Sequence, residues 1–185
     1  MNVYRVAGLS APVVLLFSVL AAVSLWPEFS WTDNHLSDLA GFEGMQPYWS
    51  ARGLPSVIFN AGLVLVGVLE LVFSGGLAKS GLVSKEGSYL FAFSAVSLVG
   101  VGALPETLGW PHVVASYAFF ISMPLAVLLA GVSIKEEKLG LAFKACAVLL
   151  GLGVIALGAL DLGAVMQFPL AVLFYACTMV LALRL

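Results

Sequence analysis

The sequence predicts an all-α, polytopic integral membrane protein: a six-transmembrane-helix bundle with a short interfacial helix in the first outer loop. The 185 residues are 62% hydrophobic and only 10% charged, with a mean hydropathy of +1.09, far above that of water-soluble proteins. Uncharged runs of spanning length recur along the whole chain. In lipid, only helices and closed β-barrels satisfy every backbone hydrogen bond. The sequence lacks the ten-residue segments of alternating polar and apolar residues that are typical of a barrel, so it predicts helices.

Six stretches have the roughly 20 mostly apolar residues that a membrane-spanning helix needs. They lie at about 8–26, 54–74, 88–104, 112–132, 141–160 and 164–185. Arg5 is the only charged residue before the first stretch, and no convincing signal-peptide cleavage site follows this stretch. We therefore interpret it as a helix that stays in the membrane. Residues 1–185 are therefore expected to form a single six-helix transmembrane domain.

Polar or conformationally restricted segments separate these stretches in order. The longest loop lies between the first and second, and lysines separate the second from the third. The segment LPETLGWPH, with two prolines and a glycine, separates the third from the fourth. Lysines again separate the fourth from the fifth, and Asp161 lies between the last two.

Basic residues fall almost entirely on one side of this predicted membrane topology. Seven of the eight lie there: Arg5, Lys79, Lys85, Lys135, Lys138, Lys144 and Arg184. Arg52 is the one basic residue on the other side, which also holds all four tryptophans. Because cytoplasmic loops carry an excess of Lys and Arg, we expect a multi-pass protein of the cell membrane with both termini in the cytoplasm.

The first outer loop contains the polar segment WTDNHLSDLA, residues 31–40. Thr32 or Asp33 is a candidate cap for a short helix, since a side-chain oxygen there accepts the free amide hydrogens of a first turn. In such a helix Asn34 and Asp38 lie on one face. Two interpretations stay open: a solvated, capped interfacial helix, or a polar lid over the mouth of the bundle.

The third loop delivers further polar groups to the same outer side. It holds Glu106 and ends at His112, which begins the fourth stretch, with Ser116 one turn deeper on the same face. A histidine at the start of a membrane helix is costly without a partner or water. It is either a structural, hydrogen-bonded histidine at the interface, or a general base or ligand that faces a cavity.

Other polar residues are placed where they would reach such a cavity. Asn60 lies about two turns into the second stretch, and Arg52 lies just before that stretch. Asp161 and Gln167 flank the last outer turn. Arg52 either pairs with a loop carboxylate or holds a phosphate or carboxylate of a ligand. Glu70, near the opposite end of the second stretch, is interpreted as a snorkelling or lysine-paired residue.

Two motifs together resemble an uncharacterised prokaryotic membrane family, domain of unknown function 998. The family pattern N-x-x-S-D-L-G resembles the segment that holds Asn34, Ser37, Asp38 and Leu39. The family pattern F-P-E…H…S resembles the segment that holds Pro105, Glu106, His112 and Ser116. Leu104 replaces the phenylalanine, Ala40 displaces the glycine, and the family does not require His35. The resemblance covers nearly the whole chain and implies six helices, with a distant, fold-level likeness to the Frag-one/DRAM membrane proteins.

The first functional hypothesis is a membrane protein with an extracytoplasmic polar pocket for a lipid or a lipid-linked substrate. The protein would either act on this substrate as a membrane-embedded enzyme or bind it. The catalytic candidates are His112, Asp38, Glu106, Ser37 and Ser116. His112 would act as the base, with a carboxylate to orient it and a serine as nucleophile or donor. The binding candidates are Asn34, Arg52, Asn60 and Asp161. A metal site of His35, His112, Asp38 and Glu106 is a less favoured version, because no tight ligand spacing supports it.

The alternative hypothesis is a non-catalytic membrane scaffold or sensor subunit. In it, the outer polar cluster ties the first loop to the third by buried hydrogen bonds, with Asp38 bonded to His112. The expected partners are membrane lipids, and the absence of any basic run or stacking platform argues against nucleic acid. The sequence leaves the cofactor, the reaction and the oligomeric state open.

Overall fold

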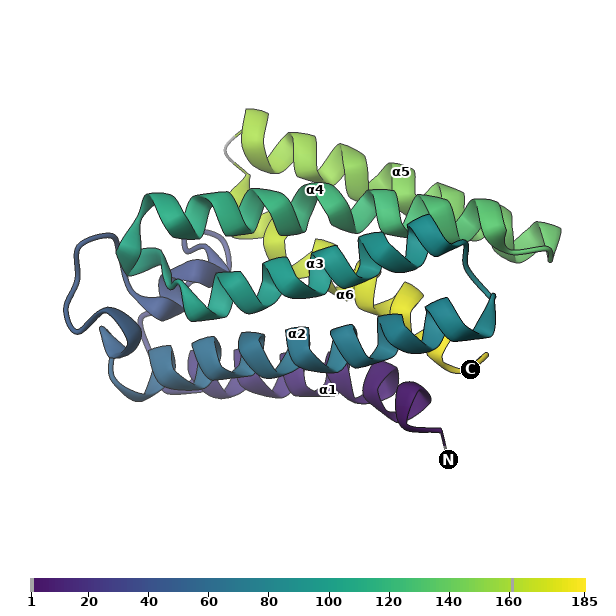
Figure 1. Ribbon diagram of the computed structural model, residues 1–185. Coiled ribbons are helices and arrows are strands. Elements are labelled where there is room, and N and C mark those ends of the chain that lie inside the picture. Colours follow the sequence, from purple (N-terminus) through teal and green to yellow (C-terminus); the bar gives the residue numbers. More distant parts are fainter. Residues whose placement is uncertain (1, 161) are drawn as a thin grey trace.

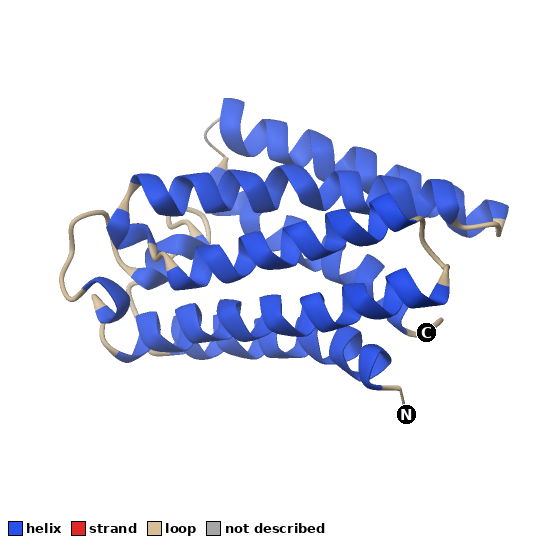
Figure 2. Cartoon of the chain, viewed as in Figure 1, coloured by secondary structure: helices blue, strands red, loops and turns tan. Residues whose placement is uncertain are grey.

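The computed structural model describes residues 2–160 and 162–185, except for the side chain of Tyr48. Helices joined by loops make up this part of the chain, and it contains no strand (Figures 1 and 2). The long helices are α1 (Val3–Ser24), α2 (Leu54–Ser80), α3 (Lys85–Ala103), α4 (Trp110–Ser133), α5 (Glu137–Ala159) and α6 (Gly163–Ala182). All six are long and apolar enough to cross a membrane. The predicted all-α class with six such helices is therefore confirmed.

Three helix ends are set by capping residues and not by the edges of the apolar runs. Asn2 caps α1, because its side chain accepts a hydrogen bond from the amide of Tyr4 at 3.1 Å. In the same way Ser84 accepts from the amide of Gly87 at 3.1 Å and starts α3. The helix α2 continues to Ser80 and ends at Gly81, whose left-handed backbone (φ 68°) suits a glycine cap. At these three ends the helices extend beyond the stretches that hydropathy alone marks out, whereas α1 ends at Ser24 and α6 at Ala182, before the predicted ends at 26 and 185.

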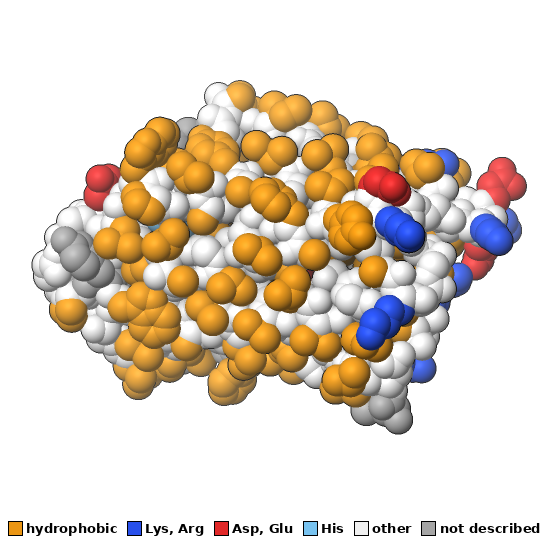
Figure 3. All heavy atoms as spheres, viewed as in Figure 1, with side chains coloured by type: hydrophobic (Ala, Val, Ile, Leu, Met, Phe, Trp, Pro, Cys, Tyr) orange, Lys and Arg blue, Asp and Glu red, His pale blue; other side chains and the backbone are white. Residues whose placement is uncertain are grey.

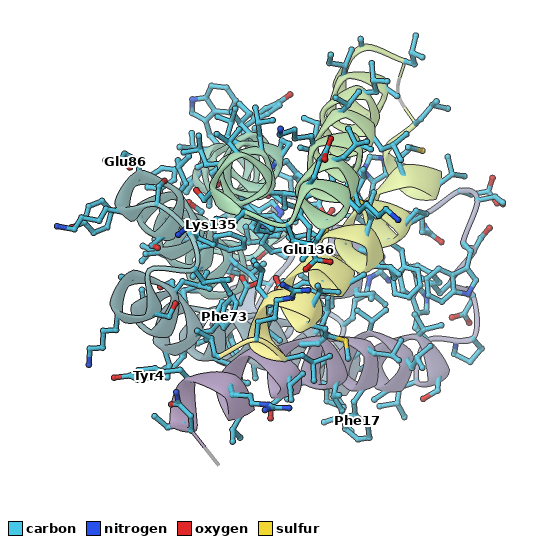
Figure 4. All side chains as sticks on the ribbon, turned by 90° about the vertical axis from the view of Figure 1, so that its right-hand side faces the viewer. Tyr4, Phe17, Phe73, Glu86, Lys135 and Glu136 are labelled. Carbon is cyan, nitrogen blue, oxygen red and sulfur yellow. The ribbon has the colours of Figure 1, made fainter. Side chains whose placement is uncertain are left out.

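The helices form a ring in chain order. Each helix packs against the next one, and α6 closes the ring by packing against both α5 and α1. Both chain ends lie at the same end of the bundle (Figure 1). Phe73 points into this ring while Phe17 points away from it (Figure 4). Aromatic rings of Phe73, Phe91, Phe119 and Phe174 stack in the interior, with neighbouring ring centroids 5.8–6.1 Å apart.

Neighbouring helices approach closely where one of them carries glycine. A Cβ atom on Gly102 would lie 2.6 Å from the carbonyl oxygen of Asn60, so α2 and α3 are in backbone contact there. Gly131 of α4 faces the backbone of α5 at Lys144 and Gly140 in the same manner. Small residues at interfaces are the usual way in which membrane helices gain van der Waals contact, since lipid provides no hydrophobic force between them.

The surface of the bundle is apolar along its length (Figure 3). Large side chains such as Phe17 and Trp110 are 72% and 73% exposed. In Figure 3 the visible Lys and Arg side chains gather at the end that carries the termini. A surface of this kind marks contact with lipid and not with water, so the chain is a multi-pass membrane protein.

The loop between α1 and α2, at the end opposite the termini, holds two 3-10 turns, η1 (Leu36–Ala40) and η2 (Tyr48–Ser50). A third, η3 (Glu106–Leu108), lies in the loop before α4. The prediction that Thr32 or Asp33 caps a helix is wrong, because η1 begins at Leu36 after His35. That the η1 segment lies at a membrane interface stays a prediction.

Candidate functional site

A cavity lies inside the ring, beneath η1, at the end opposite the termini. Its volume is about 80 Å³, several times the space that one water molecule needs. Most of the lining is apolar and comes from α1, α2, α3, α4 and α6, for example Leu15, Phe59, Leu98, Phe119 and Ala171. The polar lining residues are Ser37, His112, Ser116, Gln167 and Tyr175. The cavity is therefore mainly apolar, with a few polar groups on its wall.

His112 supplies a basic side chain to this cavity. It is 5% exposed, and its Nδ1 donates a hydrogen bond to the carbonyl oxygen of Leu104 at 2.8 Å. A carbonyl only accepts, so Nδ1 carries the hydrogen and the neutral ring keeps its lone pair on Nε2. Ser116, one turn deeper in α4, lines the same cavity, and so does Ser37 of η1. The structure thus brings together three of the five catalytic candidates.

Asp38 instead organises its own loop. Its carboxylate accepts hydrogen bonds from Nδ2 of Asn34 at 3.2 Å and from the amide of His35 at 3.0 Å. Asn34 in turn accepts from the amide of Ser30 at 2.9 Å. Asp38 is 7% exposed. Within the described part of the chain, no hydrogen bond joins Asp38 or Glu106 to His112, so the predicted carboxylate partner of the histidine is replaced by a backbone carbonyl.

Gln167 of α6 fastens η1 to the wall of the bundle. Its Oε1 accepts a hydrogen bond from the amide of Leu36 at 2.7 Å, and its Nε2 donates to Nδ1 of His35 at 3.3 Å. The His35 ring lies against Gly163, where a Cβ atom would come within 2.2 Å of it. The first loop and the last helix are therefore joined directly over the cavity.

Replacing Gln167 with leucine is expected to loosen this attachment. The Leu36 amide would lose its acceptor, and an unsatisfied half-buried donor costs about 1–3 kcal/mol. Thermal unfolding in detergent would show a lower midpoint, and hydrogen exchange would show faster exchange at Leu36. Gln46→Leu is the matched control, because Gln46 is exposed in the same loop. Equal effects of the two substitutions would contradict the assigned role of Gln167.

Arg52 holds the first loop from its other end. Its Nε donates to the carbonyl oxygen of Asp38 at 2.8 Å. The guanidinium lies 3.8 Å from the centroid of the Trp26 ring and 4.5 Å from that of Phe42. Burial lowers the pKa of Arg52, and the negative charges of Asp38, Glu28 and Glu106 oppose this shift. Arg52 therefore remains a cation that is sandwiched between aromatic rings.

Glu106 is a buried carboxyl group next to this loop. The pKa of Glu106 is raised overall, and burial is the largest cause. The negative charge of Asp38 raises this pKa further, whereas the Ser37 hydroxyl and the charges of His35 and Arg52 lower it. Its Oε2 is buried and has no hydrogen-bond partner among the described residues. The proton is thus bound more tightly in the folded protein than in the unfolded chain.

Stability is expected to depend on pH through Glu106. A carboxyl group whose folded pKa exceeds its ordinary value of 4.5 stabilises the fold most below that pH, and the contribution is lost as pH rises through the raised pKa. The thermal midpoint of the wild type should therefore fall as the pH rises above 4.5 and through the raised pKa. Glu106→Gln should flatten the profile and raise the midpoint at neutral pH. An unchanged profile in the variant would show that another group is responsible.

Among the remaining candidates, Asn60 does not line the cavity. Asn60 is fully buried and donates from Nδ2 to the carbonyl oxygen of Trp49 at 3.2 Å, so it supports the loop from below. Asp161 lies outside the described residues. The predicted metal site of His35, His112, Asp38 and Glu106 is not assembled, because no three His, Cys, Asp or Glu side chains in residues 2–160 and 162–185 could hold one ion together.

Two residues contribute in ways that the sequence did not predict. Tyr175, in the middle of α6, lines the cavity. Glu70 is 1% exposed and is not paired with a lysine, because the one ion pair within the described residues joins Arg184 and Glu136. The interpretation of Glu70 as a snorkelling or lysine-paired side chain is therefore wrong. A carboxylate in an apolar stretch was the signal that could have indicated an interior site.

Comparison with known proteins identifies one family. The model of a family described as "Protein of unknown function (DUF998)" matches residues 9–184. No curated protein and no solved structure matches the chain.

Proposed function

The chain belongs to the DUF998 family of proteins of unknown function, and from its cavity we propose that it binds a lipid or another lipid-linked amphiphile inside the membrane. The observation that carries this proposal is the composition of the cavity wall. Apolar side chains line most of it, and His112, Ser37, Ser116 and Gln167 supply polar groups beneath the first loop. Such a lining suits a molecule with an apolar chain and a polar head, of which a cavity of about 80 Å³ holds only a part.

The proposed orientation places this cavity on the extracytoplasmic side of the cell membrane. The basic side chains at the end that carries the termini support it (Figure 3), because Lys and Arg mark the cytoplasmic ends of membrane helices. The polar head of the ligand would then lie at the depth of the outer headgroups. The lipid would come from the outer leaflet.

Binding is favoured over catalysis by the way the polar residues divide. Asn34, Asp38 and Arg52 are engaged in hydrogen bonds within the first loop, which is the structural role that the scaffold hypothesis gives them. His112, Ser37 and Ser116 instead line the cavity. We assign the first group to holding the loop and the second to contacting the ligand head. An acid–base role for His112 would use the lone pair on its Nε2.

Native mass spectrometry of the detergent-released protein tests the proposal. The wild type should carry a bound lipid mass. Ala171→Phe fills the cavity, because Ala171 lines it, and should release that lipid. Ala176→Phe is the matched control on the same helix: Ala176 is exposed on the outside of the bundle, so this variant should keep the lipid.

Two outcomes would contradict the proposal. A wild type without any bound lipid shows that the cavity is not a lipid site. Lipid that is retained equally by both phenylalanine variants shows that it is bound to the outer surface. His112→Ala provides a finer measurement: it should weaken lipid retention without releasing the loop, and the affinity lost should be on the order of tenfold.

A further inference from the structure

Glu70 lies in the interior of the bundle, away from both loops and from every basic side chain described above. It is 1% exposed and sits in the middle of α2. Neither of its carboxylate oxygens has a hydrogen-bond partner among the described residues. A buried carboxylate at membrane depth is costly unless something neutralises it, so its retention there requires a partner.

Three further buried oxygen atoms come from the facing helices. The Tyr175 hydroxyl faces the Glu70 carboxylate closely enough to interact with it and serves one of its two oxygens at most. The other Glu70 oxygen, Ser94 Oγ and Thr178 Oγ1 are left buried without a hydrogen-bond partner in the described part of the chain. Buried polar side chains are nearly always satisfied, so this concentration of unsatisfied oxygens points to a ligand among them.

The register of α2 and α3 places Ser94 opposite Glu70. One turn before Glu70, Gly67 lies against the Ala95 carbonyl and the Val99 side chain. One turn after it, Phe73 packs edge to face on Phe91, with ring centroids 6.0 Å apart. Between these two contacts of antiparallel helices, Glu70 and Ser94 are at the same level.

The helix α6 completes the cluster from the other side. A Cβ atom on Gly8 of α1 would lie 2.6 Å from the Phe73 ring and 2.7 Å from the Ala182 Cβ, so Phe73 of α2 and Ala182 of α6 are at the same level. One turn before them on these two parallel helices, Glu70 and Thr178 are at the same level. Thr178 follows Phe174 by four residues and Tyr175 by three, so all three share the face that points into the bundle. Thr178 is fully buried and Tyr175 is 3% exposed.

We propose that Glu70, Tyr175, Ser94 and Thr178 form a binding site for a small monovalent metal cation such as Na⁺, at the inner end of the cavity. Carboxylate, phenol and hydroxyl oxygens are the ligands that hard cations take. The single negative charge of Glu70 favours a monovalent cation. One carboxylate balances one positive charge, whereas a divalent ion would leave a net charge in an apolar interior. Tyr175 also lines the cavity, which provides the route from the outer end.

This inference goes beyond the proposed lipid site and does not rest on it. Cation binding is measured as a change in stability, because a ligand that binds only the folded state raises the midpoint of unfolding with its concentration. Unfolding is followed in a non-ionic detergent at one pH, in NaCl, KCl or choline chloride of equal concentration. The wild type should be stabilised by Na⁺ or K⁺ and not by choline, which is too large for the site.

Substitutions then assign the effect to the cluster. Glu70→Gln, which keeps the shape and removes the charge, should abolish the difference between Na⁺ or K⁺ and choline. Ser94→Ala should raise the concentration of cation needed for half the effect by on the order of tenfold, the value of one strong oxygen contact. Ser97→Ala is the matched control one turn further along α3. The Ser97 hydroxyl is already satisfied by the Phe93 carbonyl at 2.8 Å, so its loss should leave the cation response unchanged.

The proposal is overturned if the wild type melts at the same temperature in all three salts. That result would show that a proton or a water molecule satisfies Glu70. It is also overturned if the response to the metal cation persists in Glu70→Gln. Should Glu70→Gln fail to fold, the comparison of Ser94→Ala and Thr178→Val with Ser97→Ala decides the question, and equal responses in all three contradict the site.

Discussion

Arg52→Ala is expected to lower the free energy of unfolding by about 2–3 kcal/mol and to release the first loop from the bundle. The substitution removes a charge-assisted hydrogen bond to the Asp38 carbonyl, worth about 1.5–3 kcal/mol. It also removes the stacking of the guanidinium on Trp26 and Phe42, worth about 0.5–2 kcal/mol. The midpoint of unfolding in detergent, with hydrogen exchange of the residue 36–40 amides, measures both effects.

A second arginine in the same chain serves as the control. Arg184 donates to Glu136 at 2.8 Å, but the two side chains are 39% and 58% exposed. Exposed ion pairs contribute about 0–1 kcal/mol, so Arg184→Ala should change stability far less than Arg52→Ala. Arg52→Lys should recover little, because lysine keeps the charge but has neither the planar face nor the Nε donor. A full recovery by lysine would show that charge alone matters at this position.

Gly102→Ala is expected to separate α2 from α3 and to destabilise the protein by about 1–3 kcal/mol, the usual cost of overpacking. The added Cβ would lie 2.6 Å from the Asn60 carbonyl oxygen and 2.9 Å from the amide nitrogen of Val64. Both are backbone atoms, so the strain is relieved by moving a helix and not by rotating a side chain. Neighbouring residues of both helices line the cavity, including Leu63 and Val101, so lipid retention in native mass spectra should fall too.

Gly151→Ala is the matched control for this prediction. Gly151 lies in the middle of α5, and a Cβ atom there would meet nothing within 4 Å. Alanine favours the helix over glycine by about 1 kcal/mol in water, so this variant should be at least as stable as the wild type. If both alanine variants behave alike, the close approach of α2 and α3 does not contribute to stability.

The helices were accessible from sequence because membrane insertion imposes a simple rule. An uncharged run of about 20 residues has to form a helix in lipid, whatever surrounds it. The ends were less predictable, because hydropathy marks the lipid-embedded part while caps such as Asn2 and Ser84 set the true starts. In the first loop the sequence pointed to Thr32 or Asp33 as a cap, whereas the short turn begins after His35.

The site was predictable in its residue types but not in its connections. Gln167 and Leu36 are 131 positions apart, and no pattern in the chain links them. His112 is held by the carbonyl of Leu104, and a backbone group leaves no trace in the sequence. Nearly every helical residue is apolar, so periodicity could not separate the inner faces from the lipid-facing ones. Tyr175 and Glu70 were therefore not recognised as neighbours inside the bundle.

The closure of the ring by α6 has a consequence for how the protein is made. Each of the helices α2 to α5 packs against the helix before it in the chain, so its neighbour is already synthesised when it is inserted. The cavity wall, however, includes α6, whose residues are synthesised after those of the other five helices. Until then the gap between α1 and α5 leaves the interior open to surrounding acyl chains. We expect a newly inserted chain to admit lipid through this gap, and α6 then closes the ring around what lies inside.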